Sequence, residues 1–157
     1  MNKTSDSNSP RVQRGILRTP ELNVAVFCFL LNFVWEIWQA PFFAGMPNAN
    51  HWTAVKGCTR ATVGDIAIML TAFWAVAVVM RSRVWILRAG WRCIAGFTAT
   101  GFAMTVLMER LATGPLNRWT YADSMPVVPL LGIGLLPALQ WLLLPPLVVW
   151  FTRRQLD

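Results

Sequence analysis

Four apolar stretches, each near twenty residues or longer, limit what this chain can fold into more than any other feature. They run from about 22 to 40, 63 to 80, 90 to 109 and 127 to 151. A helix needs roughly 20 apolar residues to cross the hydrocarbon core of a bilayer. Charged residues make up only 13% of the chain, about half the share in a typical soluble domain. We therefore expect an all-α, polytopic membrane bundle of four transmembrane helices.

The segments outside these spans are short and polar. Residues 1–21 are expected to form a disordered cytoplasmic tail, 22–151 the four-helix transmembrane domain, and 152–157 a second cytoplasmic tail. Thr19 and Pro20 predict the start of the first helix, as its N-cap and first-turn proline. A signal peptide is the alternative for the first apolar run. That run is longer than a usual signal core, and no clear small-x-small cleavage site follows it.

Lysine and arginine are distributed unevenly among the connecting segments. Of the 14, ten lie in the N-terminal tail, around the loop between the second and third spans, or at the C-terminus. The positive-inside rule then places both termini in the cytoplasm, with loops 41–62 and 110–126 facing outward. The net charge of +7 reflects this topology and predicts no nucleic-acid partner, because the basic residues flank spans instead of forming one surface.

Three of the seven acidic residues lie within or at the end of the apolar spans: Glu36, Asp65 and Glu109. Acids in a membrane span are costly, and they usually mark a functional site. With the orientation above, each lies within roughly 6 Å of the outer boundary, at 1.5 Å of rise per helical residue. The three acids are therefore our candidate catalytic residues, at one shared depth.

Helical spacing gives the first and third spans a polar face. Asn32, Glu36 and Gln39 are three to four residues apart and share one face of the first helix. Thr105 and Glu109 share a face of the third. We expect these two spans to pack with their polar faces inward.

Each acid also has a structural interpretation. Glu36 could be a hydrogen-bonding residue that holds helices together. Asp65 ends the string that starts at Thr62, which is typical of a capping box at the start of the second span. Glu109 precedes Arg110, so an interfacial ion pair is an alternative there.

A metal site is a weaker hypothesis. His51, Cys58 and Asp65 are spaced seven apart and offer ligands suited to zinc or copper, but the spacing matches no specific ligand motif. The chain has one histidine in all. We predict no cofactor and keep His51 and Cys58 as weak metal candidates.

The fourth span is interrupted by prolines and glycines, and Pro145 and Pro146 stand in its interior. An interior proline removes a helical hydrogen bond, so this helix is expected to be kinked. Gln140 and Trp141, which this span places in its inner half, are expected to hydrogen-bond across the bundle.

Several strings resemble a group of small, uncharacterised bacterial four-span integral membrane proteins. They are Asn32-Phe33-Val34-Trp35-Glu36-Ile37-Trp38-Gln39, Cys58-Thr59-Arg60-Ala61-Thr62-Val63-Gly64-Asp65, and Glu109 followed by Trp119-x-Tyr121-x4-Pro126 and Gln140-Trp141. That group implies no activity, but the resemblance implies a bacterial inner membrane as the location. More loosely, an intramembrane Glu followed by an outer Trp-x-Tyr resembles membrane enzymes of isoprenoid and carotenoid metabolism, whose acids protonate double bonds.

Two functional hypotheses follow from these residues. In the first, the outward polar site binds or converts a lipid-like or isoprenoid substrate by acid–base chemistry. In the second, the chain is an accessory subunit or small carrier, as a homo-oligomer or with a membrane partner, whose acids pack helices or handle a proton or metal ion. The residues expected to bind a substrate are Asn32, Trp35, Gln39, Arg60, Arg118, Trp119 and Tyr121.

Overall fold

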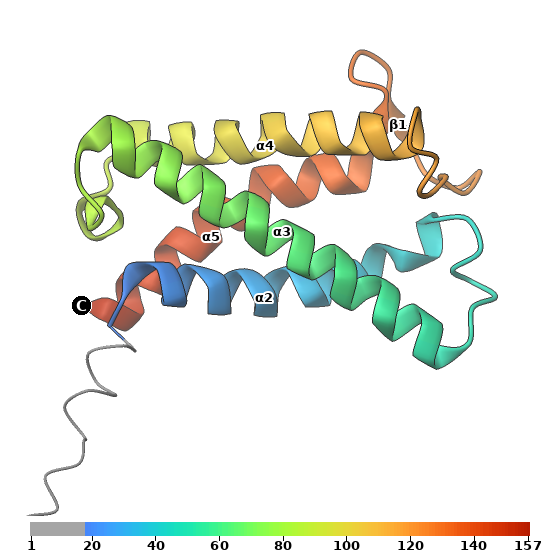
Figure 1. Cartoon of the computed structure of the whole chain (residues 1–157), viewed down its shortest axis with the longest axis horizontal. Helices are drawn as coiled ribbons and strands as arrows, with labels where there is room; N and C mark the ends of the chain where they lie inside the picture. Colours follow the sequence, from blue (N-terminus) through green and yellow to red (C-terminus); the bar gives the residue numbers. More distant parts are fainter. Residues whose placement is uncertain (1–17) are drawn as a thin grey trace, which may run out of the picture.

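The computed structural model describes residues 18–157, and this part of the chain folds mainly into four α-helices (Figure 1). They are α2 (Pro20–Gln39), α3 (His51–Met80), α4 (Trp91–Thr113) and α5 (Leu135–Leu156). The connections contain two short 3-10 turns, η1 (Ala40–Phe42) and η2 (Trp85–Arg88), and a hairpin of β1 (Val127–Val128) and β2 (Ile133–Gly134). The expected helical fold is confirmed. The expected disordered tail lies, up to residue 17, outside the described residues.

Successive helices run in opposite directions along the bundle (Figure 1). The start of α2 and the C-terminus lie at one end, here called the terminal end, together with the α3–α4 connection. The connections after α2 and α4 lie at the other, here called the distal end. Both α2 and α4 pack against α3 and α5. They therefore occupy opposite corners, and instead of packing directly on each other, as expected of the first and third spans, they place polar side chains around one cavity.

The first two helices begin at different kinds of cap. At α2 the sequence prediction holds for position, with Thr19 as N-cap and Pro20 in the first turn. The helix α3 begins at His51, where the Asn50 side chain accepts a hydrogen bond from the Thr53 amide at 2.9 Å. Much of the expected outward loop 41–62 is thus helical, because an asparagine N-cap sets an earlier start.

The capping-box interpretation of Thr62 is wrong for the same reason. Thr62 lies in the interior of α3, and its hydroxyl donates to the Cys58 carbonyl at 2.9 Å instead of capping a helix end. Asp65 is therefore free of any capping role and belongs to the helix interior.

The last helix begins later than the apolar run predicts. Residues 127–134 form the hairpin, with Gly132 at a positive φ of 65°, and α5 starts at Leu135. This start brings Gln140 into the second turn of α5, at the distal end rather than in the inner half. The helix contains Pro145 and Pro146 in its interior, and the expected kink stays a prediction.

The core of the terminal half is apolar. There the Trp85 ring packs at a tilt against Phe73 and Phe97, with centroids 5.5 and 5.6 Å away, and its indole donates to the Phe73 carbonyl at 3.2 Å. Nearer the middle, Gly101 of α4 faces the ring of Trp141, and a Cβ on Gly101 would clash with that ring. This glycine therefore lets α4 and α5 approach closely.

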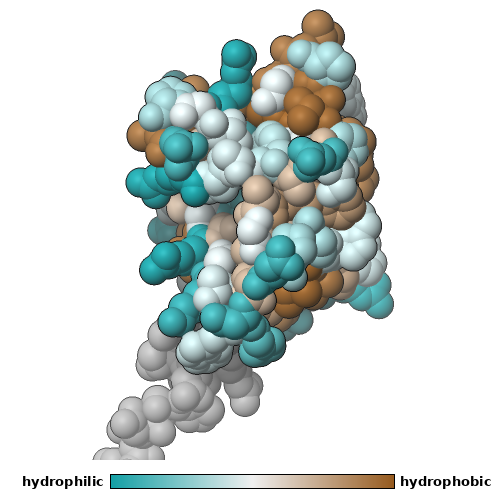
Figure 2. All heavy atoms as spheres, turned by 90° about the vertical axis from the view of Figure 1, so that its right-hand side faces the viewer, coloured by the Kyte–Doolittle hydropathy of each residue, from teal (hydrophilic) through white to brown (hydrophobic). Residues whose placement is uncertain are grey.

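The outer faces of the helices carry many exposed apolar side chains, including Val34, Val79, Leu107 and Leu147. In Figure 2, which looks onto the distal end, the right-hand flank is largely apolar. Three helices within the described residues are long and apolar enough to cross a membrane: α2 continued through η1, α3 and α5. A fourth span on α4 stays a prediction.

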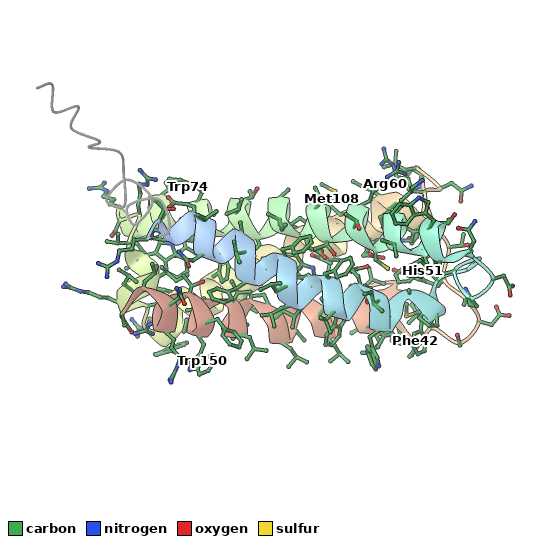
Figure 3. The ribbon with its side chains drawn as sticks, turned by 90° about the horizontal axis from the view of Figure 1, so that it is seen from below. Phe42, His51, Arg60, Trp74, Met108 and Trp150 are labelled. Atoms are coloured by element: carbon green, nitrogen blue, oxygen red, sulfur yellow. The ribbon has the colours of Figure 1, made fainter. Side chains whose placement is uncertain are left out.

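Tryptophans near the ends of the helices make cation–π contacts with basic side chains. Three such pairs lie toward the terminal end and one lies at the distal end. The distances from the cationic centre to the ring centroid are 5.1 Å for Arg83 and Trp74, 5.6 Å for Arg92 and Trp91, 5.8 Å for Arg154 and Trp150, and 5.8 Å for Lys56 and Trp52. Trp74 and Trp150 lie at a similar level on opposite sides of the bundle (Figure 3). Such tryptophans are typical of a membrane–water interface.

Candidate functional site

The polar face of α2 forms one wall of the site. Asn32, Glu36 and Gln39 are all buried, as expected from their spacing. The Gln39 amide donates to Glu36 Oε1 at 2.6 Å, and the Trp35 indole donates to Gln39 Oε1 at 3.1 Å. Glu36 is therefore held in place by its own helix.

The side chain of Gln140, from α5, lies at the centre of the polar cluster. Its Nε2 is 2.8 Å from Asn32 Oδ1, 3.2 Å from Glu36 Oε1 and 3.1 Å from Asp65 Oδ2. Its own Oε1 accepts from Gln39 at 3.2 Å. One amide thus connects polar groups of α2, α3 and α5.

Sequence reasoning placed Gln140 in the bundle but left it out of the site. The available signal was a lone glutamine in an apolar run. Because the fourth span was expected to begin at residue 127, Gln140 was expected in the inner half of the bundle, which is the wrong depth. The hairpin before α5 brings it level with Glu36 and Asp65.

Glu109 occupies a separate part of the site, near the distal end of α4. It accepts hydrogen bonds from the hydroxyl of Tyr121 and from the indole of Trp119, the latter at 3.4 Å. Among the described residues the one ion pair joins Arg83 and Glu21, so the alternative pairing of Glu109 with Arg110 is wrong. Both donors come from the connection after α4, which that carboxylate helps to hold.

This connection is tied to the segment after α2. The Ala44 amide donates to the Thr120 carbonyl, and the Ala122 amide to the Phe42 carbonyl, both at 2.9 Å. Phe43 and Tyr121 form the bridge between them. Burial, and the hydrogen bond to the carboxylate of Glu109, raise the pKa of Tyr121 well above its ordinary value. The phenol therefore stays a donor.

A cavity of about 1140 Å³ lies between the helices toward the distal end, and all three candidate acids line it. Its wall is mainly apolar, with Ile68 and Met104 among the contributors. A mostly apolar cavity with a few convergent polar groups is typical of a small-molecule site. The cavity can therefore hold a molecule of substantial apolar volume beside the carboxyl groups.

The residues predicted to bind a substrate fall into two groups. Those that line the cavity are Gln39, Arg60, Arg118 and Trp119. The others support it from behind: Asn32 bonds Gln140, Trp35 bonds Gln39, and Tyr121 bonds Glu109. Thr105 also lines the cavity, with a buried hydroxyl that has no hydrogen-bond partner within the described part of the chain.

The weak metal candidates lie apart in their surroundings. His51 is exposed at the first residue of α3, at the distal end (Figure 3), whereas Cys58 is buried and lines the cavity. Across residues 18–157, no group of three His, Cys, Asp or Glu side chains is arranged to hold a metal ion. The weak metal hypothesis for His51 and Cys58 stays untested.

No protein-family model matches the chain, and neither a curated protein nor a solved structure is significantly similar to it. This agrees with the expectation that no characterised family would match.

Proposed function

We propose that this chain is a four-span membrane protein whose cavity binds a lipid-like or isoprenoid molecule and converts it by acid–base chemistry. The observation that carries this proposal is the cavity of about 1140 Å³ lined by Glu36, Asp65 and Glu109. Such a volume exceeds what helix packing requires, since close-packed interiors contain few voids larger than a water molecule.

The surface of the bundle supports a membrane location for all four helices. On α4, Leu107, Met108 and Leu111 are exposed, as are comparable side chains on the other three helices. Large exposed apolar surfaces mark contact with lipid or another protein. The excess of arginine at the terminal end favours cytoplasmic termini, and a bacterial inner membrane is the proposed location.

The acid–base role rests on the hydrogen bonds around Gln140. Its Nε2 carries two hydrogens but lies within 3.2 Å of three oxygens, on Asn32, Glu36 and Asp65. The carboxyl groups of Glu36 and Asp65 lie around the same nitrogen, so a proton held on one of them would remove the repulsion between two negative charges. That proton is the one Glu36 would deliver to, or recover from, a bound substrate.

The other groups of the cavity would assist this step. Glu109, held by Tyr121 and Trp119, would supply a negative charge opposite a developing positive one. The faces of Trp119 and Trp141, which line the cavity, would stabilise a cationic intermediate.

A second function is favoured by the same amide. Because Gln140 joins three helices, the acids could serve mainly to hold the bundle of an accessory subunit or small carrier, acting with a second copy or a partner. In that case the carboxyl groups are needed for stability and not for chemistry.

The test compares E36Q and E109Q with E21Q. Glutamine keeps the Oε1 that accepts from Gln39 and Gln140, so E36Q should fold, while its loss of a transferable proton should reduce substrate conversion at least about a hundredfold. Extracted lipids and pigments of cells that make each variant are compared by mass spectrometry. Glu21, which pairs with Arg83 at the terminal end, is the matched control. Unchanged lipids with lowered thermal stability would instead support the structural role.

A further inference from the structure

The cavity reaches the surface of the bundle between α3 and α4. In Figure 1, these two helices diverge toward the distal end. Gly64 and Ala67 on α3 and Met108 on α4 line the cavity and are at the same time exposed. A Cβ added to Gly64 would meet nothing within 4 Å. Small residues on one side and a flexible methionine on the other thus leave a lateral opening that faces lipid if the helices span a bilayer.

Two arginines flank the distal side of this opening. Arg60 lies on α3 one turn before Gly64, and Arg118 follows the end of α4. Both line the cavity and both are exposed. Figure 3 shows Arg60 and Met108 on the same side of the bundle. Neither arginine forms an ion pair with a described carboxylate, although three carboxyl groups line the same cavity.

Charge and apolar surface therefore follow one another from the distal end inward. Two guanidinium groups that form no ion pair within residues 18–157 come first, then Gly64 and Ala67, and then the deeper wall with Ile68. Guanidinium groups bind phosphate through paired hydrogen bonds, and the apolar wall suits a hydrocarbon chain. The buried hydroxyl of Thr105, which has no hydrogen-bond partner among the described residues, offers one further hydrogen bond inside the cavity.

We propose that the opening between α3 and α4 admits a bilayer amphiphile with a phosphate headgroup, which Arg60 and Arg118 hold while its chain enters the cavity. This inference rests on the proposed function, because it names the class of molecule that reaches the acids. The amphiphile would enter from the side of the bundle, out of the membrane, with its headgroup toward the water.

The first test uses dodecyl phosphate as the probe, with inorganic phosphate as the comparison that lacks a chain. Binding to the full-length protein in a neutral detergent is measured by native mass spectrometry. Loss of both guanidinium groups in the double variant R60Q and R118Q should weaken dodecyl phosphate binding by about tenfold or more, since charge-assisted hydrogen bonds to an anion are lost. Inorganic phosphate should bind far more weakly than the amphiphile.

The second test blocks the opening without touching a charged group. G64L should place its side chain in the opening and weaken dodecyl phosphate binding by a similar factor. G96L is the matched control: Gly96 is also an exposed helical glycine whose added Cβ meets nothing, but it does not line the cavity. Equal binding of inorganic phosphate, or unchanged amphiphile binding in either the arginine or the G64L variant, overturns the inference. Because binding is measured without turnover, its outcome does not depend on whether E36Q loses substrate conversion.

Discussion

At the scale of single residues, Tyr121 offers a direct test of the site's electrostatics, because it is the only tyrosine in the chain. Its hydroxyl donates to a carboxylate in a partly buried setting, and both features favour the neutral phenol. We expect its phenolate absorbance to appear well above pH ~10, the ordinary tyrosine pKa. A spectrophotometric titration of the folded protein in detergent measures this.

The sign of the linked stability follows from the same shift. The pKa of Tyr121 in the folded protein is raised above its unfolded value of ~10. The contact with Glu109 therefore contributes its full share of the folding stability below pH ~10, and this share is lost as the pH rises through the folded-state pKa. Removing the carboxylate with E109Q should move the absorbance change toward lower pH. Titration near the ordinary value in the unmodified protein would contradict the buried contact with Glu109.

At the scale of helices, the approach of α4 to α5 depends on one glycine. G101A would place a methyl group against the Trp141 ring and should destabilise the protein by about 1–3 kcal/mol, through forced displacement of a buried side chain. G96A, on the same helix with open space around it, should stabilise the helix by up to about 1 kcal/mol, the usual difference between alanine and glycine. Thermal unfolding of both variants in detergent gives the comparison. Equal effects would show that the α4–α5 contact is looser than the structure has it.

At the scale of the whole molecule, the proposed topology puts the two ends of the bundle on opposite sides of the membrane. In a background without native cysteines, N48C and S124C, both exposed in distal connections, should react with a membrane-impermeant maleimide on intact cells. Q155C, exposed near the C-terminus, should react only after the membrane is opened. The reverse labelling pattern would show that the terminal end faces outward. Labelling of all three cysteines in intact cells would contradict a membrane-spanning bundle.

Some features of this protein followed from its sequence alone, because they depend on local patterns. Apolar runs near the length of a membrane span predicted helices, since such a run must satisfy its own backbone hydrogen bonds. The start of α2 at Thr19 and Pro20 depends on residues that are neighbours in the chain. The buried face of Asn32, Glu36 and Gln39 follows from the period of a single helix.

Other features did not follow from the apolar pattern, and some were decided only by tertiary structure. The interior position of Thr62 in α3 and the late start of α5 depend on an asparagine cap and a hairpin, which are local in the chain but which the apolar pattern alone did not predict. Gln140 reached the centre of the site because this later start set its depth against residues more than 70 positions away in the chain. Hydropathy reports how much of a run prefers lipid, and not which side chain meets which across a bundle. The cavity and its opening between α3 and α4 therefore emerged only when the helices were packed together.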